Sequence, residues 1–317
     1  MIHPENQDGG AFPQIPESGG LRKSSSVLIL RGGPPLALAG YIVLTAVAVA
    51  VLTPLLWTVV SSFRPSAELF SGRFSFRPET FTLDNYLALF RPLERDIGGQ
   101  VKIFPPIPYG RYFVNSVFVS TTATLLSLFF CSLGGYGFAK YTFRGKQPLF
   151  AVLLGSMMIP FHVALVPLYI EIARFGWTNS FQALIVPGAA GAFGIFLMRQ
   201  YMAGVPNDLI DAARIDGCSE FGIYWRVALP IVKPALGAMT IMLFMFHWND
   251  FLWPSMVLFE EAKFTLPVGL KALISTYNEE YGVLLAGTTL GVLPVVALFL
   301  WMQKEFVEGI TLGAVKE

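Results

Sequence analysis

Charged side chains are scarce in this sequence. Of its 317 residues, 14% are Asp, Glu, Lys or Arg and 54% are hydrophobic, whereas an ordinary soluble domain has about 25% charged residues. The hydrophobic residues form long uncharged blocks and do not recur at the spacing of an amphipathic helix or strand. This composition predicts one membrane domain whose main solvent is lipid.

Groups that usually carry chemistry are also scarce. The sequence has two cysteines, Cys131 in an apolar block and Cys218 in a polar segment, and three histidines. These numbers argue against a disulfide framework and against a Cys/His metal site. The net charge of +1 gives no reason to expect a nucleic-acid partner. We find no Ser-His-Asp arrangement and no paired catalytic carboxylates, so we predict that the chain is not an enzyme and binds no cofactor.

Long apolar segments dominate what is present. A helix needs about 20 apolar residues to cross a hydrocarbon core about 30 Å thick. Six segments meet or nearly meet that length, at residues 36–60, 113–138, 150–170, 181–198, 235–258 and 281–302. The predicted fold class is therefore all-α, a polytopic membrane helical bundle with about six transmembrane helices.

The remaining segments predict the domain organisation. Residues 1–35 are rich in Gly, Pro and Ser and are expected to form a disordered cytoplasmic tail. Residues 36–302 form the predicted transmembrane domain, and residues 303–317 a cytoplasmic C-terminal tail.

Proline and glycine inside the spans predict local geometry. Neighbouring helices can satisfy the backbone groups that a proline frees in a membrane. We therefore expect kinks, and not helix ends, at the prolines within the spans, which are Pro54, Pro160, Pro167, Pro187 and Pro294. Small residues allow close helix contact, so the glycines of the second span are expected to serve packing; they are Gly134, Gly135 and Gly137.

Basic residues in the loops predict the orientation. With both termini in the cytoplasm, the inner segments carry 12 Lys and Arg residues and the outer segments carry 10. Seven of those 10 lie in residues 61–112 among several acidic residues, a mixture typical of a folded surface cap. Outside that cap the comparison is 12 against 3, which favours cytoplasmic termini.

The polar segment between the fourth and fifth spans has the signals of two short helices. Asn207 or Asp208 is suited to cap the first helix, and Gly217 to end it in a left-handed conformation. Ser219 is suited to cap a second helix that runs to Arg226, with Leu229 and Pro230 closing the unit. Helical periodicity places four residues on one side of the first helix, with Asp211 and Arg214 opposite at i, i+3 spacing; the four are Leu209, Ala212, Ala213 and Asp216.

That segment resembles the EAA signature of ATP-binding-cassette importer permeases. The signature reads Glu-Ala-Ala, three residues, Gly, nine residues, then Ile-x-Leu-Pro. Its places fall on Asp211, Ala212, Ala213, Gly217, Val227, Leu229 and Pro230, with Asp216 directly before the glycine. Asp and Val depart conservatively from Glu and Ile at two of these places. The residue runs 248–254, 266–270 and 306–316 are similar to the carbohydrate-uptake branch, which includes the maltose and glycerol-phosphate permeases.

The resemblance implies a function and a set of partners. It implies one permease subunit of an ATP-driven, binding-protein-dependent importer of sugars or related small solutes in the bacterial cytoplasmic (inner) membrane. The implied partners are a second homologous permease, two ATP-binding-cassette ATPases and an extracytoplasmic solute-binding protein. ATP and Mg would be bound by the ATPases, and the segment of residues 205–230 would be the coupling loop that contacts them. The sequence has no Gly-x-x-x-x-Gly-Lys-Ser/Thr motif for a nucleotide of its own.

The fifth span contains a polar group of residues. A carboxylate within the membrane is costly unless it pairs or faces water, so Asp250 is a functional candidate. Trp248 and Asn249 beside it have the aromatic and amide chemistry of sugar sites. The three residues are candidates for the translocation pathway, although an interfacial packing role is also consistent with them. The alternative function is an ion-coupled secondary transporter with Asp250 and His162 as its relay; His162 otherwise reads as a hydrogen-bond donor at a proline kink.

Overall fold

The computed structural model describes residues 34–69, 81–97, 100–104, 107–276 and 281–314. The chain divides into two units, residues 1–55 and 56–317. Helix α1 (Pro34–Ser62) forms the described part of the first unit and ends within the second. Most of the predicted N-terminal tail lies outside the described residues, so its disorder stays a prediction.

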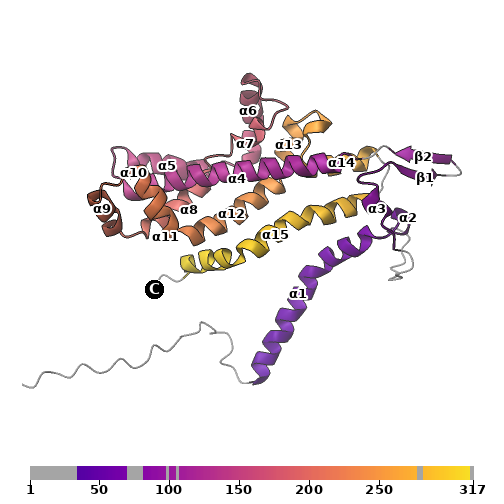
Figure 1. The fold of residues 1–317 in the computed structure, drawn as a ribbon, viewed down its shortest axis with the longest axis horizontal. Helices are drawn as coiled ribbons and strands as arrows, with labels where there is room; N and C mark the ends of the chain where they lie inside the picture. The colour runs from indigo at the N-terminus through magenta and orange to yellow at the C-terminus, as the bar shows by residue number, and fades with distance from the viewer. Residues whose placement is uncertain (1–33, 70–80, 98–99, 105–106, 277–280, 315–317) are drawn as a thin grey trace, which may run out of the picture. The chain divides into compact units, whose positions relative to one another are not determined.

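Long helices form the frame of the second unit. Helix α12 (Lys233–Trp248) lies between α4 (Tyr109–Lys140) and α15 (Tyr281–Ala314), and α8 (Ala192–Ala203) packs along α4 (Figure 1). Apolar side chains along these contacts are buried against one another, which is the arrangement expected of a helical bundle. The predicted all-α membrane bundle is confirmed.

The spans are less regular than the sequence predicts. Three helical segments are long and apolar enough to cross a membrane, namely Leu38–Ser62, Tyr109–Lys140 and Tyr281–Val307. Two bent pairs reach that length together: Lys146–Ser156 with Phe161–Arg174 at 102°, and Glu220–Ile231 with Lys233–Val257 at 84°. These correspond to five of the six predicted spans. The remaining one, residues 181–198, is divided between α7 (Gln182–Ile185) and α8.

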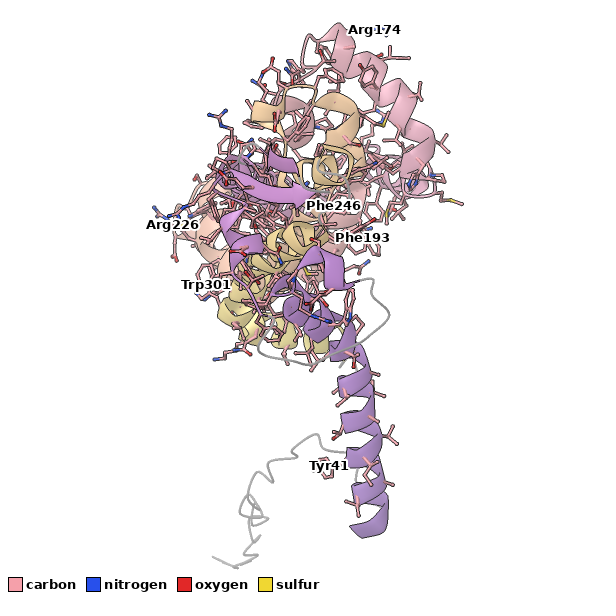
Figure 2. The ribbon with its side chains drawn as sticks, turned by 90° about the vertical axis from the view of Figure 1, so that its right-hand side faces the viewer. Tyr41, Arg174, Phe193, Arg226, Phe246 and Trp301 are labelled. Atoms are coloured by element: carbon pink, nitrogen blue, oxygen red, sulfur yellow. The ribbon has the colours of Figure 1, made fainter. Side chains whose placement is uncertain are left out.

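The prolines fall into two groups. Pro54, Pro167 and Pro294 lie inside continuous helices, as predicted. At Pro160 and Pro187 the prediction of kinks is wrong, because helices end there. Helix α5 (Lys146–Ser156) stops before Pro160, and α6 (Phe161–Arg174) begins directly after it and carries Arg174 to its far tip (Figure 2). Proline offers no N–H and disfavours helical geometry in the residue before it, so a sharp turn forms where two short helices meet.

The segment between the first two spans departs from an all-α fold. It contains α2 (Ser66–Leu69), α3 (Asp84–Leu87) and an antiparallel hairpin of β1 (Leu93–Ile97) and β2 (Gln100–Phe104). The buried Asn85 side chain ties this segment together by donating to the carbonyls of Ser62 at 2.9 Å and Arg64 at 2.8 Å. Its described residues are thus folded, in agreement with the predicted cap.

The segment between the last two spans contacts the N-terminal end of α4. It contains α13 (Leu252–Val257), the 3-10 turn Glu261–Lys263 and α14 (Leu266–Thr276). The Asn179 side chain accepts hydrogen bonds from the amides of Phe259 and Glu260, both at 3.1 Å. In Figure 1, α14 and the β hairpin lie at one end of the second unit, and α9 (Asn207–Ile215), α10 (Glu220–Ile223) and α11 (Leu229–Ile231) gather at the opposite end.

Candidate functional site

Residues 205–232 form two helical segments joined at a glycine. Gly217 has a φ of +80°, in the left-handed region that favours glycine. Its amide donates to the carbonyl of Arg214, and the amide of Cys218 donates to the carbonyl of Ala213, both at 3.0 Å. These bonds close the C-terminal end of α9 as the sequence predicts.

The predicted caps of these helices had different outcomes. The Ser219 hydroxyl accepts a hydrogen bond from the amide of Gly222 at 3.1 Å, so the predicted cap of the second helix is confirmed. The predicted cap at Asn207 or Asp208 is wrong, because both residues lie inside α9 and Pro206 precedes it without a side-chain cap. The Asn207 Oδ1 atom instead accepts from Lys140 Nζ at 2.9 Å.

The second helix is also longer than predicted. It does not end at Arg226 but continues through a π-helical turn, Tyr224–Ala228, into α11. Val227 and Leu229 pack against the hydrophobic cluster at the C-terminal half of α4, while Pro230 is exposed. A single helical path thus runs from Glu220 to Ile231 before the 84° bend into α12.

The small-residue face of α9 is divided between the inside and the outside. Ala213 is buried with Ile210, which the sequence reading did not place on the inward side. Leu209, Ala212 and Asp216 are exposed, so three of the four residues predicted on this side are open to another protein and Ala213 is not. The helix rests on the chain's own core through Ile210 and Ala213, which leaves Ala212 open to another molecule.

Four polar side chains connect α9 to α10 and to the end of α4. Arg214 donates to Glu220 at 2.8 and 3.2 Å and to Asp211 at 2.8 Å. The Tyr141 hydroxyl also donates to Glu220. The Arg214 guanidinium, together with the Tyr141 hydroxyl, lowers the pKa of the Glu220 carboxyl to about 2. Burial, followed by the bond to Glu220, raises the pKa of Tyr141.

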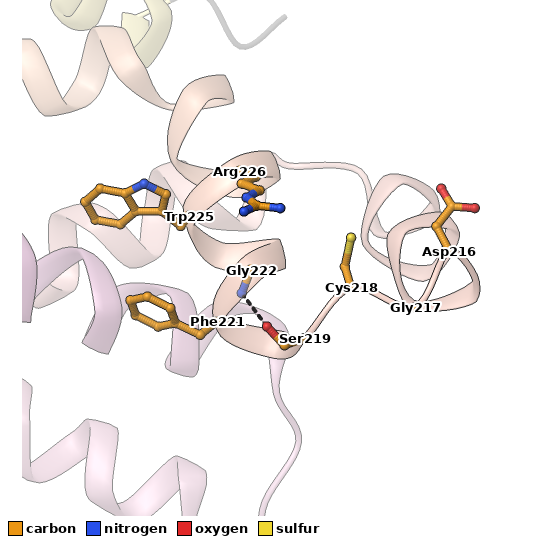
Figure 3. A pocket seen from close by; sticks show the side chains of 8 residues that line it. All are labelled: Asp216, Gly217, Cys218, Ser219, Phe221, Gly222, Trp225 and Arg226. Carbon is orange, nitrogen blue, oxygen red and sulfur yellow. Dashed lines mark hydrogen bonds between the residues drawn. The ribbon is translucent and has the colours of Figure 1, made fainter.

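A hollow of about 550 Å³ lies between the two helical segments. Figure 3 shows Asp216 on one side of it, Phe221 and Trp225 on the other, and the chain from Gly217 to Ser219 running between them. Ile215 at the end of α9 is 87% exposed, and Phe221 and Trp225 are more than half exposed. This part of the chain therefore presents apolar side chains beside charged ones.

The predicted pathway residues each make contacts within the chain. The Trp248 indole is buried and donates to the carbonyl of Gly291 at 3.1 Å. Asn249 is exposed, and its amide donates to the carbonyl of Met245 at 2.9 Å. The Asp250 carboxylate accepts hydrogen bonds from the backbone of Leu252 and Trp253 at the start of α13. Their role in a pathway stays a prediction.

The break between α7 and α8 carries polar groups that the sequence reading missed. The Ser127 hydroxyl of α4 donates to the carbonyl of Gly188 at 3.2 Å, and the Cys131 thiol donates to that of Gly191 at 3.5 Å. His247 approaches from α12, where its Cε1 atom lies 3.6 Å from the Cβ position of Gly188. Its Nε2 atom, like Thr124 Oγ1, is buried without a hydrogen-bond partner in the described part of the chain.

Comparisons with known proteins agree on what this arrangement is. Residues 131–311 match the model of the family described as "Binding-protein-dependent transport system inner membrane component". The chain belongs to this family of permeases. The match includes the whole segment of residues 205–232 and the fifth span, so the predicted recognition is confirmed.

The similarity extends over most of the permease. It is 39% identical over 272 residues, 85% of this chain and 93% of the other, to the arabinooligosaccharides transport system permease protein AraQ of Halalkalibacterium halodurans. Its fold matches a bacterial ABC transporter involved in the import of the acidic polysaccharide alginate, with a TM-score of 0.71, 23% identity, and coverage of 86% and 96%. A second match is an alginate ABC transporter in complex with an alginate pentasaccharide-bound periplasmic protein, with a TM-score of 0.58, 11% identity, and coverage of 84% and 92%.

Family membership makes the chain a transport component and a multi-pass protein of the inner membrane. The alternative of an ion-coupled secondary transporter has no such support. The two residues of the predicted ion relay also make different contacts: Asp250 binds the backbone of α13, and His162 is exposed on α6. The His162 side chain makes no hydrogen bond to the residues that the structure describes, so the expected bond at the proline kink is not found.

Proposed function

We propose that this permease is one of two membrane subunits of an ATP-driven carbohydrate importer and that residues 205–232 are its coupling loop. The observation that carries the proposal is the exposed outer face of α9, where Ala212 lies next to Leu209 and Ile215. A small side chain between two apolar ones lets another protein's backbone approach closely while apolar surface is buried. The carbohydrate assignment is supported by the AraQ relative and the alginate importers.

The proposed complex has four kinds of component. This permease would pair with a second homologous permease chain, two ATP-binding-cassette ATPases and an extracytoplasmic solute-binding protein. ATP and Mg would be bound, and ATP hydrolysed, by the ATPases, because the permease has no P-loop sequence to hold a nucleotide. Both termini and the coupling loop would lie in the cytoplasm, and α14 and the β hairpin at the external end.

The coupling surface is proposed to use the signature residues in two ways. Ala212 and Asp211 lie on the exposed side of α9 and would contact the ATPase directly, with Asp216 at the rim of the hollow. Ala213 and Gly217 would set the shape of the loop, and Val227, Leu229 and Pro230 would join it to α12.

The pathway is proposed to pass the break between α7 and α8. Ser127, which binds this break, lies near the middle of α4 and therefore near the middle of the membrane. The amides of Gly188, Ala190 and Gly191 donate no hydrogen bond within the described residues, and these three residues are exposed. Irregular backbone with free polar groups is not tolerated against lipid. This face would thus meet water, solute or the second permease, together with Asn249 and the neighbouring Trp248 and Asp250.

Recovery of the complex tests the proposal. Tagged permease is solubilised in detergent from native membranes, and the co-purifying chains are identified. We expect an ATPase with a P-loop and a second permease chain. Ala212→Arg should abolish recovery of the ATPase but keep the second permease, whereas Ala262→Arg, at an exposed position in the opposite loop, should keep both. Recovery of the permease alone, with uptake independent of ATP, would refute the proposal.

A further inference from the structure

The C-terminal end of α4 is connected to both ends of the coupling helix α9. At the first end, Lys140 Nζ donates to the carbonyl of Val205 and, at 2.9 Å, to the Asn207 side chain. Asn207 is the first residue of α9. The last residue of α4 is therefore bonded to the start of the coupling helix, although 67 positions separate Lys140 from Asn207 in the sequence.

At the C-terminal end of α9 the connection runs through a series of hydrogen-bonded side chains. The Tyr141 hydroxyl donates to Glu220, and Glu220 accepts two hydrogen bonds from the guanidinium of Arg214 in the last turn of α9. A guanidinium that binds a carboxylate through two N–H groups holds it in a defined orientation. Lys140 and Tyr141 are adjacent, so one point at the end of α4 fixes both ends of a nine-residue helix.

The opposite end of α4 is bonded to the segment between the last two spans. The Tyr112 hydroxyl donates to Glu261 at 2.6 Å, and the Asn115 amide donates to the carbonyls of Ala262 at 3.0 Å and Phe264 at 2.9 Å. The Ser116 hydroxyl accepts from the amide of Leu266 at 2.7 Å. These bonds hold residues 261–266 against the first two turns of α4.

A single helix separates the two sets of contacts. The 32 residues of α4 contain no proline, and a helix of that length is about 48 Å long. Its inner half packs against α8 with no space for a side chain at Gly135. A rigid element with polar contacts at both ends can carry a displacement from one end to the other.

We propose that Lys140 and Tyr141 are positioning residues that make α4 move with the coupling helix, so that α4 carries the motion of the ATPase to residues 261–266 on the other side of the membrane. The inference rests on the proposed function, because α9 must be where the ATPase docks. It adds the route by which the docked helix reaches the external side. Arg144, three residues beyond Tyr141, serves as the control because it is exposed and none of the contacts described above involves it.

The test compares Lys140→Met, Tyr141→Phe and their combination with the control Arg144→Met. Each permease is purified with its partner chains and reconstituted in liposomes with the solute-binding protein and solute. The measured quantities are the recovery of the ATPase, the ratio of ATP hydrolysis with loaded binding protein to hydrolysis without it, and uptake per ATP hydrolysed.

We expect the double variant to retain its ATPase and to lose about fivefold or more of the stimulation ratio and of uptake per ATP. The single variants should fall between it and the control, which should match the unmodified chain. Unchanged ratios in the double variant would overturn the proposal. Loss of the ATPase from the double variant would also overturn it, because the two residues would then serve only to shape the docking surface. If the unmodified chain recovers no ATPase, the proposed function itself fails.

Discussion

Gly135 and Met198 lie so close together that a Cβ atom on Gly135 would be 2.6 Å from the Cβ of Met198. The same Cβ would be 2.7 Å from the amide nitrogen of Arg199, so neither a side chain nor the backbone of α8 has space for it. Gly137, two residues further along α4, has no atom within 4 Å of its Cβ position. Of these two glycines, only Gly137 leaves space for a side chain.

This difference predicts the effect of adding a methyl group. Gly135→Ala should destabilise the permease by about 1–3 kcal/mol, because α4 and α8 must separate to accept it. Gly137→Ala should have no destabilising effect. Thermal unfolding of the two purified variants in detergent measures the difference. Equal midpoints would mean that α4 and α8 do not pack as described.

The left-handed conformation of Gly217 predicts a second effect. Gly217→Ala should cost about 1–2 kcal/mol, because a side chain is disfavoured at a φ of +80°. Gly155→Ala, in α5 with open space at its Cβ position, is the matched control. Hydrogen exchange at the amides of residues 207–217 should accelerate in the first variant alone. Unchanged exchange would indicate that the turn adopts another conformation.

The cap of α10 predicts a local effect. Ser219→Ala removes the acceptor for the amide of Gly222 and should cost about 1 kcal/mol. Ser219→Asp should restore the protection of that amide, since aspartate is also a good cap. Amide exchange at Gly222 distinguishes the two variants. Faster exchange in both would mean that the serine hydroxyl, and not capping in general, is required.

The pKa of Glu220 predicts how the segment of residues 205–232 responds to acid. The carboxyl has a pKa of about 2 in the folded chain against an ordinary value of 4.5. A lowered pKa means that its bonds stabilise the fold above pH 4.5 and are lost as the pH falls toward 2. Infrared spectra of the protein with labelled glutamate should show Glu220 ionised at pH 3.5. Arg214→Gln should bring its titration back toward 4.5, and an unchanged titration would contradict the assigned partner.

The natural cysteines test the orientation. Cys218 is exposed in the proposed coupling loop, whereas Cys131 is buried in α4. A membrane-impermeant maleimide should not label the permease in intact cells and should label Cys218 in inside-out vesicles. A Cys218→Ser chain with Glu261→Cys should react in intact cells, while one with Lys146→Cys should not. Labelling of Cys218 from outside would reverse the proposed topology.

Local chemistry made the turn at Gly217 predictable. A glycine before a serine is enough to indicate a left-handed stop and a new cap, because both depend on backbone bonds within a few residues. Helical spacing also gave the faces of α9 but not which one lies inside. That choice depends on Ile210 and Ala213 meeting a core built from α8 and the π-helical turn, and no local pattern contains this information.

Hydropathy could not predict the break in the fourth span. Apolar composition is the same whether residues 181–198 form one helix or two, and Pro187 with Gly188 fits either a kink or a break. Two polar groups of α4 favour the break, since Ser127 and Cys131 satisfy carbonyls that a continuous helix would have bonded internally. The place of His247 beside this break could not be predicted for the same reason, because only the fold brings it to Gly188.

The hydroxyl groups of α4 also bear on how the chain is assembled. Ser116, Ser120, Thr124 and Ser127 occupy one face of this helix, and all four are buried. The ribosome produces α4 before α7, α8, α12 and α14, all of which contact this helix. About 40 residues separate the end of α4 from the start of α7, and about 90 separate it from the start of α12. While these residues are synthesised, at several residues a second, the row of hydroxyls is not yet covered by the later helices. Until the later helices arrive, these hydroxyls can bond only to carbonyls of α4 itself, as Ser132 does with Leu128, or to groups outside the chain.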